Sequence, residues 1–105
     1  MRGIYVITVM SRVQRDSLGY PAFGATRTVG YYLNKNEAEL AVTNNAADMC
    51  EGCYNYALIE QIKPGIYQSA SPENRWWFKF NDEKEQYEPI DEPEFLNNMS
   101  GFFIG

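Results

Sequence analysis

The chain contains no histidine, and this absence excludes several kinds of chemistry. None of its 105 residues can supply an imidazole, the side chain that titrates near neutral pH. Serine–histidine and cysteine–histidine nucleophiles are therefore excluded, together with the commonest transition-metal ligand. We expect a protein that is not an enzyme, with catalysis by carboxylates alone as the alternative.

Cysteine is also scarce, with only Cys50 and Cys53 in the chain. Two cysteines do not make a disulfide scaffold. Their spacing is that of redox pairs and zinc half-sites, but a predicted helix ends here, and a thiolate is favoured where a helix begins. No histidine or third cysteine is available to complete a zinc site within one chain. An incidental spacing, labile thiols and a metal shared between two chains stay open; we expect no bound metal and no cofactor.

Basic residues and long apolar runs are few. Nine Lys and Arg against fourteen Asp and Glu give a net charge of −5, which argues against general nucleic-acid binding. No apolar run approaches the roughly 20 residues of a membrane-spanning helix. The start of the chain shows no signal-peptide pattern. The predicted location is therefore the cytoplasm, with no membrane association.

The chain has enough apolar residues for a small core. Hydrophobic residues make up 45% and aromatic residues 15% of the chain. A chain of this length buries a core without disulfides or metals, and no internal boundary is visible. We expect one compact domain over residues 1–105.

The strand pattern centres on Tyr54 to Ile62, whose middle is apolar on both faces and which ends at Pro64-Gly65. Pro89 marks a later strand as an edge strand. The prediction is an α+β fold with a mainly antiparallel sheet of about five strands, in the order ββαβββ, and one helix across one face. The other predicted strands are Ile4–Val13, Thr26–Leu33, Arg75–Phe80 and Gln86–Ile90.

A single helix is predicted between the second and third strands. Asn34 is a favourable N-cap, and Glu37 stands where a capping box needs it. The helical period predicts a helix over Lys35–Met49 with a small apolar stripe toward the sheet. Asn45 falls within this stripe, so its amide needs hydrogen-bond partners.

The segment Gln14–Ala25 is rich in turn residues and is predicted to be a long loop. It contains two candidate binding residues, Tyr20 and Phe23. One interpretation is that both rings fold back and cap the core. The other is that they belong to a mobile binding loop.

The strongest candidate for a recognition surface is the alternating run Arg75–Phe80. Its pattern predicts a strand with Trp76 on the core face and Arg75, Trp77 and Lys79 on a face open to solvent. Trp and Arg are common anchors at interfaces. With Arg27 and Tyr32, these residues also suit stacking of a nucleobase. The alternatives are cation stacking on the indole ring and coverage of this face by the tail.

The end of the chain combines acidic and aromatic residues. The acidic residues between Asp82 and Glu94 are interpreted as a solvated face rather than a catalytic pair. Phe102-Phe103-Ile104 is too apolar to remain in solvent. It is expected to dock on the core or on a second subunit, which predicts a homodimer through the tail.

Several short runs resemble an uncharacterised family of small bacterial and prophage-encoded proteins, a domain of unknown function. The resemblance covers about Tyr5 to Phe95 and implies no catalytic residue, because the group has no assigned activity. It implies a cytoplasmic, bacterial or phage setting. The runs that carry it are Arg27–Tyr32, Tyr56–Glu60, Pro64–Tyr67, Trp76–Phe78 and Glu92–Glu94.

Acidity, aromatic residues and the lack of histidine together favour a binding function. The prediction is a small, non-enzymatic accessory protein that recognises a protein partner, for example as a prophage-encoded factor that blocks a host defence. The alternative is a protein that binds or sequesters a nucleotide-like ligand through arginine and aromatic side chains.

Overall fold

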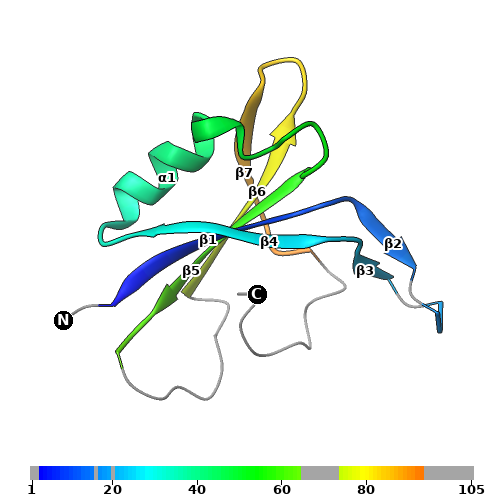
Figure 1. Ribbon diagram of the computed structural model, residues 1–105, viewed down its shortest axis with the longest axis horizontal. Coiled ribbons are helices and arrows are strands. Elements are labelled where there is room, and N and C mark those ends of the chain that lie inside the picture. The colour runs from blue at the N-terminus through cyan, green and yellow to red at the C-terminus, as the bar shows by residue number, and fades with distance from the viewer. Residues whose placement is uncertain (1–2, 16, 20, 65–73, 94–105) are drawn as a thin grey trace.

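The computed structural model describes residues 3–15, 17–19, 21–64 and 74–93 (Figure 1). Tyr20 and the aromatic tail lie outside these residues, so the expected role of Tyr20 and the homodimer through the tail stay predictions. Within the described residues, no helix is long and apolar enough to cross a membrane.

Five antiparallel strands form the main sheet, in the spatial order β4-β1-β5-β6-β7. One helix packs across one of its faces, which confirms the predicted α+β fold. Taken along the chain, the sheet strands and the helix follow the predicted order ββαβββ, and β5 lies in the middle as expected. The strands are β1 (Ile4–Met10), β4 (Thr26–Tyr32), β5 (Tyr56–Ile62), β6 (Arg75–Asn81) and β7 (Gln86–Ile90).

The predicted loop between the first two sheet strands is partly a hairpin. The first strand ends at Met10 rather than Val13, and a separate two-stranded sheet follows. It is formed by β2 (Val13–Arg15) and β3 (Pro21–Phe23). The turn residues therefore connect two short strands, and Phe23 returns the chain toward the main sheet.

The helix α1 (Lys35–Thr43) begins where the sequence predicts. The side-chain oxygen of Asn34 accepts hydrogen bonds from the backbone N–H groups of Asn36 and Glu37, at 2.8 and 3.3 Å. These are two of the amides that have no partner inside a helix, so the cap stabilises the first turn.

The predicted end of the helix at Met49 is wrong. The C-cap is Asn44, and Asn45 turns out of the helix with a left-handed φ of 49°. Its side-chain oxygen accepts from the N–H of Cys50 at 2.9 Å, and its amide donates to Asp48 Oδ1 at 3.2 Å. The Asn45 amide therefore does find partners, but in a turn that contains the short 3₁₀ helix η1 (Ala46–Asp48).

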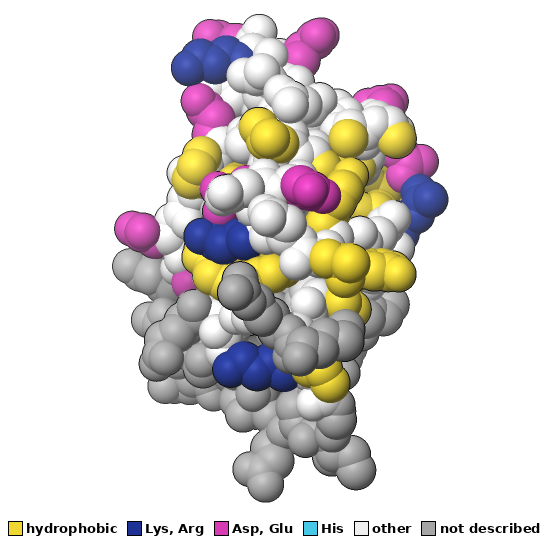
Figure 2. Space-filling view, turned by 90° about the vertical axis from the view of Figure 1, so that its left-hand side faces the viewer, with side chains coloured by type: hydrophobic (Ala, Val, Ile, Leu, Met, Phe, Trp, Pro, Cys, Tyr) yellow, Lys and Arg dark blue, Asp and Glu magenta, His cyan; other side chains and the backbone are white. Residues whose placement is uncertain are grey.

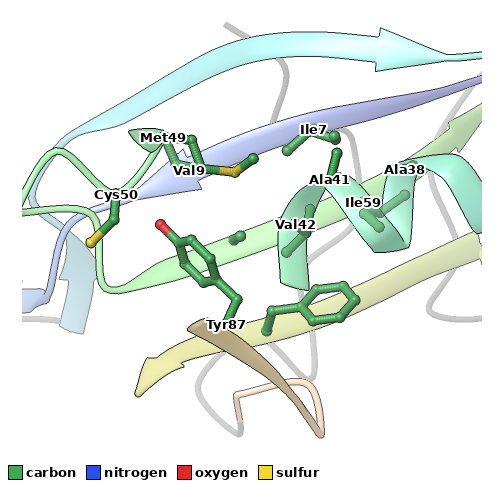
Figure 3. Close-up of a cluster of buried hydrophobic side chains, with 11 residues drawn as sticks. Ile7, Val9, Ala38, Ala41, Val42, Met49, Cys50, Ile59 and Tyr87 are labelled. Atoms are coloured by element: carbon green, nitrogen blue, oxygen red, sulfur yellow. The ribbon is translucent and has the colours of Figure 1, made fainter. Parts of the chain in front are cut away.

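The core lies on both faces of the sheet. On the side of α1, Tyr87 is 1% exposed and donates its hydroxyl to the carbonyl of Tyr54 at 2.7 Å. Burial is the main cause that raises the pKa of this phenol above its ordinary value. Figure 3 shows this helix-side core, which consists of Ile7, Val9, Ala38, Ala41, Val42, Met49, Cys50, Ala57, Ile59, Phe78 and Tyr87.

The opposite face of the sheet carries a smaller buried cluster. Met10, Leu58 and Trp77 form its centre, and Phe23 from β3 packs against it. An antiparallel sheet often leaves one face in solvent. Here the central strands are buried on both faces, which changes the environment of the candidate residues on β6.

Candidate functional site

The predicted recognition face on β6 has the expected alternation but not the expected exposure. Trp76 packs against the helix-side core, and Trp77 belongs to the cluster on the opposite face. Trp77 is 3% exposed and Arg75 is 5% exposed, so the prediction that both face solvent is wrong. Only Lys79 of this group is exposed.

Trp77 and Arg75 are engaged with the rest of the fold. The indole N–H of Trp77 donates to Glu92 Oε1 at 3.2 Å, and Arg75 Nη1 donates to the same oxygen at 3.1 Å. Arg75 Nε lies 3.7 Å from Glu60 Oε2, and the Glu60 side chain is completely buried. Glu60 is a charged residue on a face of β5 that is otherwise uncharged, and the buried guanidinium of Arg75 lies beside it. These contacts explain the burial: the two residues join β5, β6 and the segment after β7.

Phe23 also belongs to this cluster. Its ring stacks on Trp77 with the centroids 5.8 Å apart and meets the Tyr56 ring edge-on at 5.4 Å. For Phe23, the interpretation that it folds back and caps the core fits the structure. The ring covers part of the face that the sequence pattern leaves to solvent.

The other two candidates, Arg27 and Tyr32, both line a hollow at the β4 edge of the sheet, on the face that α1 covers. The hollow has a volume of about 490 Å³ and opens between β4 and the segment that joins α1 to β5. We call it the β4 hollow. It is lined by Ile7, Arg27, Val29, Gly30, Tyr31, Tyr32, Ala41, Ala46, Ala47, Asp48, Met49 and Glu51.

The floor of the β4 hollow is part of the core, and its rim is charged. Ile7 and Met49 are buried side chains of the helix-side core, and Figure 3 shows the end of Met49 directed toward Ile7. At the rim, Arg27 forms an ion pair with Glu51, and both side chains remain about half exposed. Asp48 adds a second acidic group. The hollow therefore offers an apolar floor beneath a rim with one uncompensated negative charge.

Gly30 leaves space at the side of the hollow. A Cβ atom placed on Gly30 would meet no atom within 4 Å, and the backbone of Gly30 is not left-handed. Gly30 pairs with Ile7 across β1, so it lies on the same face as the buried floor. The register between β4 and β1 shifts beside Gly30, at Val29. The glycine is thus not required by its backbone angles, and its missing side chain is what leaves this space open.

The wall opposite Gly30 is built from strained backbone. Asn45, Ala47, Asp48 and Glu51 all have φ between 49° and 53°, the left-handed region. For Ala47 and Glu51 this conformation costs about 1–2 kcal/mol each, whereas Asn45 and Asp48 are of the residue types that adopt it more readily. Strained residues persist only where the surrounding structure holds them, and they concentrate at ligand sites. Three of the four line the hollow.

Few ionisable side chains surround the hollow. The rim holds one cation and two carboxylates, and one carboxylate is already paired with the cation. Within residues 3–15, 17–19, 21–64 and 74–93, no group of three or more Cys, Asp or Glu side chains is arranged to hold a metal ion. Cys50 is buried and Cys53 is exposed, both as free thiols.

Three large apolar side chains of β4, α1 and the turn between them are exposed to solvent. Tyr31 is 61% exposed, and Leu33 and Leu40, which adjoin lining residues in the sequence, are 68% and 60% exposed. Figure 2 views the molecule from the side on which α1 lies and shows hydrophobic patches bordered by charged groups. Tyr31 pairs with Val6, one position from the Gly30–Ile7 pair, so its ring is on the sheet face opposite the floor of the hollow.

Comparisons with protein-family models, with curated proteins and with solved structures found no match. The resemblance to small bacterial and prophage-encoded proteins therefore stays a prediction.

Proposed function

We propose that this is a non-enzymatic binding protein that recognises a protein partner, and that it does so at the β4 hollow. The observation that carries the proposal is the empty space beside Gly30, which lies over buried core residues at the edge of the sheet. A side chain from a partner that enters this space removes apolar surface from water, which is the main source of favourable binding energy.

The charge of the rim favours a protein partner over an anionic ligand. Arg27 is the cation a phosphate would need, and it is already paired with Glu51, while Asp48 lies beside the same rim. A phosphate would have to break this ion pair and would still face two carboxylates.

A small ligand is the second candidate, because one observation favours it. The volume of about 490 Å³ lies within the range of small-molecule sites, and Arg27 and Tyr32 both line the hollow. This second candidate corresponds to the predicted alternative of a nucleotide-like ligand, for which Arg27 and Tyr32 were among the expected binding residues. That the partner is a host defence factor, and the protein phage-encoded, stays a prediction.

The proposal is tested with a variant whose added side chain occupies the space beside Gly30. Gly30→Val adds a side chain where a Cβ meets no neighbour, in a strand where valine is favoured, so stability should stay equal or rise slightly. Thr26→Val is the matched control: it places the same side chain on the same strand, but Thr26 pairs with Met10 on the opposite face and does not line the hollow.

Wild type and both variants are used to co-purify partners from the cells that encode the protein, with mass spectrometry of proteins and of small molecules. We expect one protein to be retained by wild type and Thr26→Val and lost with Gly30→Val. A small molecule with this pattern would support the second candidate. Equal recovery of every species on all three baits would refute a role for the β4 hollow.

A further inference from the structure

We infer that the partner presents an extended segment that pairs with the Gly30–Tyr32 part of β4 and carries a large apolar residue next to a basic one. This inference rests on the proposed function and specifies the kind of partner. It comes from the position of β4 at the edge of the sheet that the described residues form, from the space beside Gly30 and from the charge of the rim.

Among the strands that the structure describes, β4 is the outermost on its side of the sheet, with β1 as its neighbour. An outermost strand presents backbone N–H and C=O groups that pair with an added strand. The bulge at Val29 interrupts the register with β1, whereas Gly30, Tyr31 and Tyr32 pair regularly with Ile7, Val6 and Tyr5. A regular edge is therefore available on the Gly30 side of the bulge.

The apolar residue follows from the position of Gly30. Directly opposed residues of neighbouring strands bring their Cβ positions within about 5 Å. A large side chain on the added strand, placed opposite Gly30 on the helix side, would lean over the glycine. Aromatic side chains pack over edge glycines in this way. The buried floor formed by Ile7 and Met49 would meet the end of such a side chain.

The basic residue follows from the rim. Asp48 and Glu51 line the hollow with Arg27 as the only cation among its lining residues. The whole chain carries a net charge of −5, so a basic segment is also attracted at a distance. An acidic segment would be repelled by both. A lysine or arginine near the apolar residue of the partner segment therefore complements this surface.

The probe is a display library of random twelve-residue peptides, which is selected on the wild-type protein alone; the enriched peptides are then measured for binding to Gly30→Val and Thr26→Val. We expect the enriched peptides to share one Phe, Tyr, Trp, Leu or Ile with a Lys or Arg within three positions. Enrichment of acidic peptides, or of peptides without a large apolar residue, would overturn the inference.

The strand geometry is tested with the best enriched peptide in two N-methylated forms, which block alternate amides. In an added strand only every second N–H faces β4. One form should lose affinity about tenfold or more, and the other should bind nearly as well as the parent peptide. Equal affinities for the two forms would show that the segment does not bind as a strand.

The charge is tested with Asp48→Asn. Asparagine tolerates the left-handed φ of 52° at this position, and its oxygen can still accept from Asn45, so the turn should be kept. Binding of the peptide should weaken about threefold at low salt, and the difference should shrink at high salt. Unchanged or tighter binding would contradict the charge argument.

The two proposals fail in different ways. If the enriched peptides bind Gly30→Val as well as wild type, the β4 hollow is not the site and the proposed function fails. If binding is lost in Gly30→Val but both N-methylated forms bind equally, the hollow is the site and only the strand geometry fails.

Discussion

Trp77→Ala should strongly destabilise the fold, although its strand pattern places Trp77 on a solvent-facing row. The ring is 3% exposed and belongs to the cluster formed with Met10 and Leu58. Truncating a buried tryptophan to alanine costs about 3–5 kcal/mol, from lost burial and from the cavity left behind. Small domains have a total stability of about 5–15 kcal/mol, so this one change removes a large part of it.

Two contacts add to the cost of removing the ring. The indole N–H donates to the carboxylate of Glu92 at 3.2 Å, and the ring stacks on Phe23. A hydrogen bond to a charged group contributes about 1.5–3 kcal/mol. Trp77→Phe keeps an aromatic ring but removes this donor and part of the buried ring volume. It should therefore lose about 1–3 kcal/mol, less than Trp77→Ala.

Urea unfolding followed by circular dichroism measures the free energy of unfolding of each variant. Trp76→Ala is the control, because Trp76 is only partly buried and packs beside Tyr5, with Lys35 over its ring at 4.5 Å. It should lose about 1–3 kcal/mol, since less of its ring leaves the water on folding. A larger loss for Trp76→Ala than for Trp77→Ala would show that the burial of the two faces of β6 is reversed.

Two further predictions concern a strained turn and a surface carboxylate. Ala47→Gly should raise the free energy of unfolding by about 0.5–1 kcal/mol in thermal melts, because Ala47 has a left-handed φ of 53°, whereas Ala46→Gly, where φ is not positive, should lower it. A lower free energy of unfolding for both variants would contradict the interpretation that the backbone is strained at Ala47. Hydrogen bonds from Asn81 and then Lys84 hold the pKa of Glu88 below its usual value, so its contribution to stability is present above the ordinary glutamate pKa and is lost as the pH falls through the lowered one. In Asn81→Ala the pKa should rise toward the ordinary value in a carboxyl NMR titration, and an unchanged pKa would refute this cause.

The parts of the fold that depend on neighbouring residues could be predicted from the sequence. The cap at Asn34 needs only a side chain and two nearby amides. The alternation of β6 follows from the period of a strand, and the antiparallel sheet follows from strands separated by turn residues. The exposure of Trp77 could not be predicted in this way. It depends on Phe23 and Glu92, which reach the ring from distant parts of the chain.

The end of the helix and the position of the β4 hollow could not be predicted from the sequence, for one shared reason, although Arg27 and Tyr32 at the hollow were among the candidate residues. The small apolar stripe of α1 continues past Thr43 and favours a helix up to Met49, but Asn45 hydrogen-bonds to the backbone of Cys50 instead and stabilises a turn. That turn carries the strained residues that form the wall of the β4 hollow across from Gly30. A helix that ran straight to Met49 would not place Ala47 and Asp48 at this wall in a left-handed conformation. The hollow therefore exists because a side-chain hydrogen bond ends α1 early. A glycine in an edge strand shows only where a space beside the sheet can form. Whether the space does form depends on the position of the turn that follows α1.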